Sequence, residues 1–162
     1  MKKQFLTFAL SIAILLGGAI PAYALDNNMV GTHTITRASQ YLDGYSVGIG
    51  ARGNGKIAVA MTVDGTGIME KIGVAEVEIE YKTNGVWRYY DSLFAAEHPE
   101  FYEYNSRDFV GTTYFQGTPG VSYRVTLTVY ARNSKGSDTG YITSYTIVCL
   151  SLIHISEPTR RS

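Results

Sequence analysis

The chain has 162 residues, of which 45% are hydrophobic and 17% are charged, and its formal net charge is zero. This length suits one globular domain with its own hydrophobic core. Residues 25–149 hold ten Lys and Arg against thirteen Asp and Glu, a mildly acidic balance that lacks the basic footprint of nucleic-acid binding. Cys149 is the only cysteine, which excludes an intrachain disulfide; it is either a buried thiol or the partner of a cysteine outside this sequence.

Residues 1–24 predict a secretory signal peptide. Lys2 and Lys3 precede an apolar run from Phe5 to Leu16, which is too short to span a bilayer. The triplet Ala22-Tyr23-Ala24 then provides an A-x-A cleavage pattern. We therefore expect a secreted protein with no transmembrane segment in the mature chain; an uncleaved membrane anchor is the alternative.

The remaining chain predicts an all-β domain over residues 45–149. Residues 25–44 are polar and aperiodic, as expected of a flexible start or a first edge strand. After them, short apolar alternations are separated by turn signals, which favours a sandwich or barrel. The expected strands are Tyr45–Arg52, Lys56–Val63, Ala75–Lys82, Val86–Leu93, Arg107–Phe115, Ser122–Arg132 and Thr139–Val148.

The first hairpin turns at Gly53-Asn54-Gly55. A three-residue loop pairs Ile49 with Val59 and Val47 with Met61, apolar against apolar, whereas a two-residue loop would pair Gly50 with Val59. The sequence therefore predicts a type I turn followed by a bulge, with Gly55 in the left-handed region.

The second hairpin turns at Asn84-Gly85. The same criterion favours a three-residue loop from Thr83 to Gly85, with Tyr81 opposite Trp87 and Ile79 opposite Tyr89. This register predicts that Tyr81 and Trp87 share the core face and that Gly85 closes the turn.

Residues 95–105 predict a connection with room for one helical turn, and two strands follow it. From Ser122 to Arg132, apolar and polar residues alternate strictly, which indicates a strand with one face in a core. A turn at Ser134-Lys135-Gly136 leads into the last predicted strand.

The end of the chain is unlike the rest. Residues 150–160, L-S-L-I-H-I-S-E-P-T-R, resemble the in-frame translation of a transposase-type sequencing adapter. We therefore expect residues 150–162 to be a non-native tail and exclude them from the fold prediction, with a genuine tail as the alternative.

Two resemblances add to this interpretation. The run from Thr118 to Tyr123 and the turn from Asn133 to Ser137 resemble strand F and the F–G turn of fibronectin type III domains. That resemblance implies an immunoglobulin- or fibronectin III-like β-sandwich of about seven strands. It also implies that Tyr123 forms a tyrosine corner, in which its hydroxyl bonds upstream backbone. Trp87 departs from the family, whose core tryptophan lies early in strand B.

The second resemblance is to small secreted proteins of Gram-positive bacteria with no assigned function. It depends on the signal peptide together with three short motifs and the Tyr123 strand, and it implies location and fold without residue roles. The motifs are Arg37-Ala38-Ser39, Met69-Glu70-Lys71-Ile72-Gly73 and Gly85-Val86-Trp87.

Residues 94–104 hold the densest group of candidate ligand-binding side chains. Aromatic rings beside carboxylates are what a sugar-binding surface needs, although they equally fit a small satellite core under a loop. Glu97 and Glu100 are also the residues of a weak calcium site or of an enzyme acting with His98, two readings that the sequence supports less well. The candidate ligand-binding residues are Phe101, Tyr102, Tyr104, Glu97 and Glu100.

The sequence thus predicts a secreted, non-enzymatic β-sandwich that binds an extracellular protein or a glycan, with no cofactor, metal or nucleic acid. A surface-associated location is compatible with this interpretation. A carbohydrate-binding module using the 94–104 connection and a structural subunit assembled through its sheet edges are the alternatives. The residues predicted to have structural roles are Tyr123, Trp87, Tyr81, Gly55 and Gly85.

Overall fold

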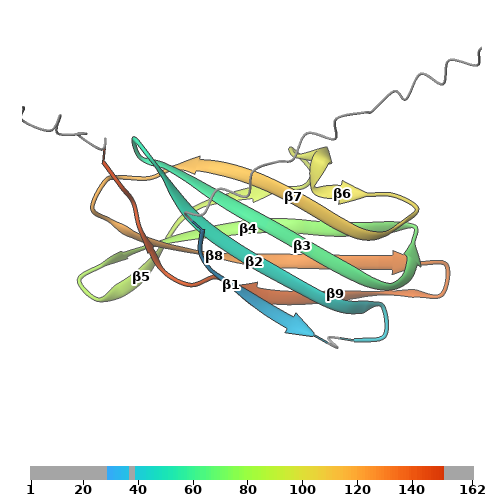
Figure 1. Cartoon of the computed structure of the whole chain (residues 1–162). Helices are drawn as coiled ribbons and strands as arrows, with labels where there is room; N and C mark the ends of the chain where they lie inside the picture. The colour runs from blue at the N-terminus through green and yellow to red at the C-terminus, as the bar shows by residue number, and fades with distance from the viewer. Residues whose placement is uncertain (1–28, 37–38, 152–162) are drawn as a thin grey trace, which may run out of the picture.

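A computed structural model describes residues 29–36 and 39–151 and shows two antiparallel sheets packed face to face (Figure 1). The predicted all-β sandwich is therefore confirmed. The predicted signal peptide and residues 152–162 of the predicted tail lie outside the described residues.

The first sheet contains four strands, and each is antiparallel to its neighbours. In spatial order they are β1 (Met29–Thr36), β2 (Leu42–Gly53), β3 (Lys56–Met69) and β7 (Ser106–Gln116). Because β1 pairs with β2, the segment before residue 45 contains an edge strand, one of the two predicted alternatives.

The second sheet is built around β4 and β8. One edge of β8 pairs with β9 and, beyond a break, with β10. The far edge of β4 pairs with β5 and with the short β6. The strands are β4 (Lys71–Thr83), β5 (Val86–Phe94), β6 (Tyr102–Glu103), β8 (Ser122–Asn133), β9 (Gly136–Thr143) and β10 (Ile147–Val148).

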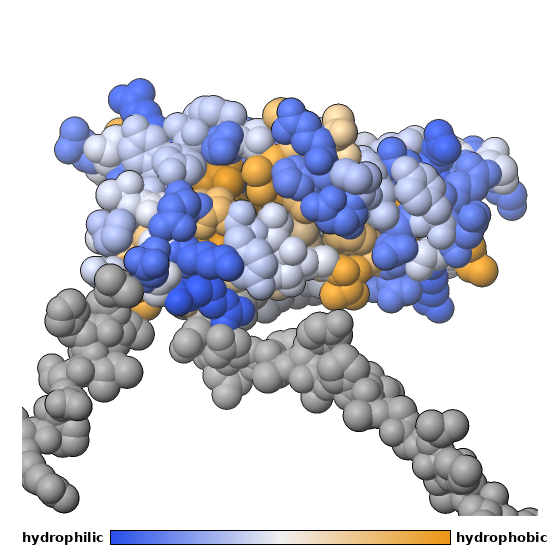
Figure 2. All heavy atoms as spheres, turned by 90° about the horizontal axis from the view of Figure 1, so that it is seen from above, coloured by the Kyte–Doolittle hydropathy of each residue, from blue (hydrophilic) through white to orange (hydrophobic). Residues whose placement is uncertain are grey.

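The core lies between the two sheets and follows the predicted alternation. In β8 the inward side chains are almost inaccessible to solvent, while their neighbours face outward. Hydrophobic residues also reach the surface in the middle of the side that carries β7, between hydrophilic ones (Figure 2). The inward residues of β8 are Tyr123, Val125, Leu127, Val129 and Ala131.

The first hairpin has the predicted register but a different turn. Val47 pairs with Met61 and Ile49 with Val59. Gly55 is left-handed, with φ of 78°, and so is Asn54, with φ of 52°. Two consecutive left-handed residues form a two-residue type I′ turn. The extra residue is therefore taken up by a bulge in β2, between Ala51 and Gly53, which leaves the apolar pairs in phase.

The second hairpin contradicts the predicted register. Asn84 and Gly85 form a two-residue loop in which both residues are left-handed, so Tyr81 pairs with Arg88 and Trp87 with Lys82. A bulge in β5, opposite Ile79 and Glu80, then shifts the register by one residue. Farther along the strand, an apolar residue of β5 therefore pairs with an apolar residue of β4 again. The prediction assumed one uninterrupted register and missed this bulge, so it wrongly placed Trp87 on the core face. Tyr81 does pack against the core.

Tyr123 has the role that the fibronectin resemblance implies. Its hydroxyl accepts a hydrogen bond of 2.9 Å from the backbone N–H of Thr118, five residues upstream. Its ring meets those of Tyr90 and Phe115 edge to face, with centroids 5.4 and 5.5 Å apart. A side chain at Gly117 would strike this ring, with its Cβ 2.9 Å away. The bend before β8 is thus fixed by one buried hydroxyl and by the ring that carries it.

Replacing Tyr123 by Phe should lower the free energy of unfolding by about 1–2 kcal/mol, because the N–H of Thr118 loses its partner. Chemical denaturation measures this change. Tyr130→Phe is the matched control, since Tyr130 lies on the outer face of the same strand and its hydroxyl has no hydrogen-bond partner within the described residues. Equal stability of the two variants would contradict a structural role for the Tyr123 hydroxyl.

Candidate functional site

The aromatic residues predicted as one binding surface do not lie together. Phe101 ends the 3-10 turn η1 (Pro99–Phe101), the predicted helical turn of the connection, and only 1% of its surface is exposed. His98 stacks on it, with centroids 4.9 Å apart, whereas Tyr104 is 61% exposed. The prediction is therefore wrong for Phe101, which belongs to the core and cannot contact a ligand.

The predicted carboxylates lie on the outside of the same connection. Glu97 and Glu100 are exposed, and Glu100 bonds to Nδ1 of His98 at 3.0 Å. Hydrogen bonds, first from backbone N–H and then from His98, lower the pKa of Glu100. Across residues 29–36 and 39–151, no three His, Cys, Asp or Glu side chains come close enough to hold a metal ion. The calcium alternative is therefore not supported by the geometry.

Tyr102 lies on the outer face of the second sheet rather than with Phe101. The ammonium of Lys71 is 3.7 Å from the centroid of its ring, and the ring of Tyr130 is 6.4 Å away. Burial raises the pKa of the Tyr102 hydroxyl. The backbone approaches closely here because Gly73 has no side chain: a Cβ at Gly73 would lie 2.1 Å from the carbonyl oxygen of Phe101.

The same outer face carries a regular grid of side chains, which we call the platform face. The strand registers place these residues in rows across β9, β8, β4 and β5. One row runs Tyr141, Thr128, Glu76, Phe94; the next runs Thr143, Thr126, Glu78, Ser92; a third runs Arg124, Glu80, Tyr89.

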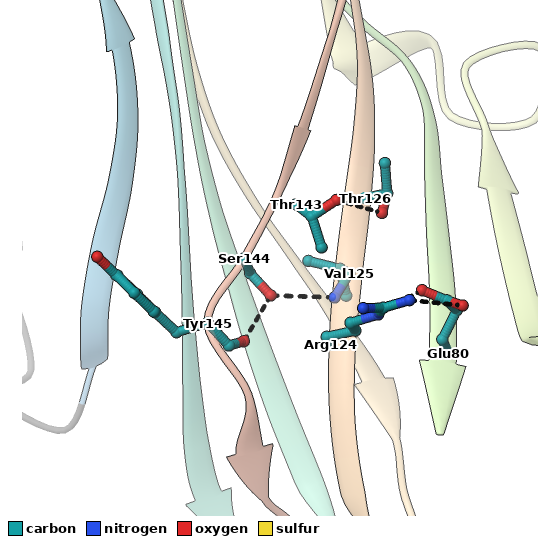
Figure 3. Close-up of polar contacts among 7 residues, drawn as sticks. All are labelled: Glu80, Arg124, Val125, Thr126, Thr143, Ser144 and Tyr145. Atoms are coloured by element: carbon teal, nitrogen blue, oxygen red, sulfur yellow. Dashed lines mark hydrogen bonds and ion pairs between the residues drawn. The ribbon is translucent and has the colours of Figure 1, made fainter. Parts of the chain in front are cut away.

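One end of the platform face is held rigid by an ion pair and a stacked indole. Glu80 accepts hydrogen bonds from Nε of Arg124 at 2.6 Å and from Nη2 at 3.1 Å (Figure 3). The guanidinium carbon of Arg124 lies 4.4 Å from the ring centroid of Trp87. A bidentate pair that is also stacked on an aromatic ring fixes all three side chains. Trp87 is thus part of the outer face.

The middle of the platform face is organised by hydroxyl groups. The hydroxyls of Thr126 and Thr143 are 2.9 Å apart, and Ser92 donates to Oε1 of Glu76 at 2.8 Å. Glu78, between these pairs, makes no side-chain hydrogen bond within the described part of the chain. Its carboxylate therefore remains an available acceptor.

Ser144 sets where β9 ends beside this face. Its hydroxyl accepts a hydrogen bond from the backbone N–H of Val125 at 3.0 Å and donates one to the carbonyl of Tyr145 at 2.8 Å (Figure 3). The Ser144 hydroxyl thus takes the place of one backbone acceptor in the pairing of this segment with β8. The chain turns away after Thr143, and Tyr145 crosses toward β1, where its ring lies over Gly31.

Three aromatic side chains on the platform face are open to solvent. Tyr89, Phe94 and Tyr141 are 63%, 46% and 65% exposed. Phe94 and Tyr141 stand at opposite ends of one row, about 14 Å apart at the usual spacing between strands. Exposed aromatic rings can stack on the apolar face of a ligand ring. The hydroxyls and carboxylates beside them can form hydrogen bonds with the polar edge of the same ligand.

The sequence contained part of this signal. The alternation of Glu76, Glu78 and Glu80 with apolar residues, and the outward polar residues of β8, both indicate an outer face. The aromatic contribution of β5 was missed because the wrong hairpin register turned Trp87 and Tyr89 inward.

Comparison with protein families and curated proteins adds no class to the all-β sandwich that the structure shows. No protein-family model matches the sequence, and no curated protein matches it significantly. No helix in the described parts of the chain is long and apolar enough to cross a membrane. The case for function therefore rests on the platform face itself.

Replacing Arg124 by Met should shift the tryptophan emission to longer wavelength, because Trp87 loses its stacked cation and becomes more mobile. Trp87 is the only tryptophan, alongside 13 tyrosines, so fluorescence excited selectively at tryptophan reports on this site alone. Arg132→Met is the control, since Arg132 pairs with Glu70 at 3.7 Å at the other end of the same strand. An unchanged emission spectrum in the Arg124 variant would show that the stack does not define the environment of Trp87.

Proposed function

We propose that this protein is a secreted, non-enzymatic binding module that holds a glycan on its platform face. The observation that carries the proposal is the placement of Tyr89, Phe94 and Tyr141, large and exposed, around the carboxylates of Glu76 and Glu78. Exposed apolar patches of this kind on a folded domain mark interaction sites.

A sugar ring suits this arrangement better than a purely apolar ligand does. Its C–H faces stack on aromatic rings, and its hydroxyls donate to carboxylates and exchange hydrogen bonds with threonine and serine. Rings at both ends of a row favour a ligand that extends across the strands. The central line of Glu76, Glu78 and Glu80 disfavours polyanions, so a neutral glycan fits the face best.

The same proposal includes an extracellular location and a relationship to fibronectin type III domains. The signal-like residues 1–24 support secretion. The order of hairpins supports the relationship: β2–β3, then β4–β5, a lone β7 and finally β8–β9, with Tyr123 at a tyrosine corner. Domains of that architecture commonly serve as extracellular binding modules.

A glycan array followed by calorimetry with the best ligand tests the proposal. Phe94→Ala and Tyr141→Ala should each weaken binding about tenfold, which corresponds to ~1.4 kcal/mol of lost stacking. Both positions are exposed, so the unfolding temperature should change little.

Tyr114→Ala provides the matched control, because Tyr114 is 49% exposed on the outer face of the other sheet. It should leave glycan affinity unchanged. An array blank for all neutral glycans, or equal losses in all three variants, would refute the proposed site; capture of a protein ligand by the platform face instead would replace the glycan by a protein partner.

A further inference from the structure

The first sheet ends in two unguarded edges, β1 and β7. Among the residues that the structure describes, each of these strands pairs with a neighbour on one side only. Edge strands usually carry charged residues, especially lysine, or a proline, and these discourage further pairing. Residues 29–36 of β1 contain no Asp, Glu, Lys, Arg or Pro, and in β7 the charged residues are confined to Arg107 and Asp108 at its start. In the β5 edge of the other sheet, the charged residues Arg88 and Asp91 lie within the strand rather than at its start.

The hydrogen bonds at both ends of β7 show which of its backbone groups face outward. The N–H of Gly117 bonds inward to the carbonyl of Gly55. The backbone of Asp108 instead bonds to the Ser106 hydroxyl, and the carbonyl of Gln116 accepts from the Tyr90 hydroxyl at 2.8 Å. Since both backbone groups of a residue in an antiparallel strand face the same side, the even-numbered residues of β7 face outward.

Three of these even-numbered residues remain open. Asp108 and Gln116 are occupied by side-chain hydroxyls, whereas the outward N–H and C=O groups of Val110, Thr112 and Tyr114 have no partner within the described residues. The side chains of all three residues are exposed, Val110 to 71%.

The strand registers show in the same way which backbone groups of β1 face outward. Even residues of β3 face β2, as in the pair Ala58 with Gly50, so odd residues of β2 face β1. The odd residues of β1 meet them, as in the pair His33 with Val47. Thr32 and Thr34 therefore direct their backbone groups outward, and both are exposed.

The two edges are complementary in direction. The sheet has four strands, all antiparallel, so β1 and β7 run in opposite directions. Because neighbouring strands of a sheet are twisted relative to one another, a second copy related by a translation combined with a rotation would bring its β1 antiparallel to β7 of the first copy. Thr34 would then pair with Thr112, and Thr32 with Tyr114, in hydrogen-bonded pairs whose side chains all lie on the outer face.

We propose that copies of this protein associate head to tail by adding β1 of one copy to β7 of the next, which continues the first sheet. The occupant is a second copy rather than an unrelated extended segment because the chain supplies both halves of the pairing. This association uses neither the platform face nor its residues, so it stands independently of the proposed glycan binding.

Proline substitutions at the outward positions test this association. Proline removes one N–H and is tolerated on an edge where that N–H faces solvent. Thr34→Pro and Thr112→Pro should each leave the protein folded and reduce its mass in solution to that of the monomer. The wild-type chain should show a mass that rises with concentration, measured by light scattering and sedimentation on the full chain.

Thr113→Pro is the control for the assignment of faces. Its N–H faces β3, in the pair with Val59, so proline there should break the internal ladder and lower the unfolding temperature far more than Thr112→Pro does. Equal destabilisation by the two variants would contradict the assignment of outward residues.

A mixing experiment decides how the copies join. Thr34→Pro retains an intact β7 and Thr112→Pro an intact β1, so each alone should be monomeric and an equimolar mixture should form one-to-one dimers. Three results would overturn the proposal: wild type that stays monomeric at about millimolar concentration, a mixture that stays monomeric, or a Thr34→Pro variant that still dimerises through two β7 edges.

Discussion

The alternation of side chains along β8, and along β4 from Glu76 onward, is the constraint on which the rest of the structure depends. Each inward residue of these strands packs between the sheets, and each outward residue is thereby committed to the platform face. Because a shift of one residue would exchange the two sets, the hydrophobic core fixes the position of every carboxylate and threonine on the surface. The same alternation therefore determines both the packing of the core and the side chains that the outer face presents.

Bulges decide how far this alternation can be read from the sequence. The register of the first hairpin was predictable because apolar residues oppose one another there, and β8 was predictable because its apolar residues alternate without interruption. The last predicted strand, Thr139–Val148, was only partly right, because the structure divides it into β9 and β10. The β4–β5 hairpin was not predictable, because a bulge in β5 lets a tight two-residue turn coexist with apolar pairs at the far end. Pairing aromatic with aromatic residues favoured Tyr81 opposite Trp87, but in the structure the indole of Trp87 stacks on Arg124 on the outer face.

Tertiary contacts account for the error at the 94–104 connection. Composition alone cannot separate Phe101 from Tyr104, since both are aromatic and lie near acids. The separation comes from Gly73, whose missing side chain lets the backbone around Phe101 approach β4 and place that ring in the core. The candidate site therefore lies on a sheet face rather than in the predicted loop. Strand geometry, not loop conformation, positions each of its groups.

The two surfaces lie on different parts of the sandwich, and this separation has a consequence for binding. The platform face belongs to the second sheet, whereas the open edges belong to the first. Copies joined in this way would present their platform faces at regular intervals along the assembly, each rotated from the last by the twist of the sheet. A glycan with repeated units would then meet several equivalent faces, and the later binding events would become intramolecular. Individually weak stacking on exposed aromatic rings is well matched to such an array, because affinity would come from repetition rather than from a deep pocket.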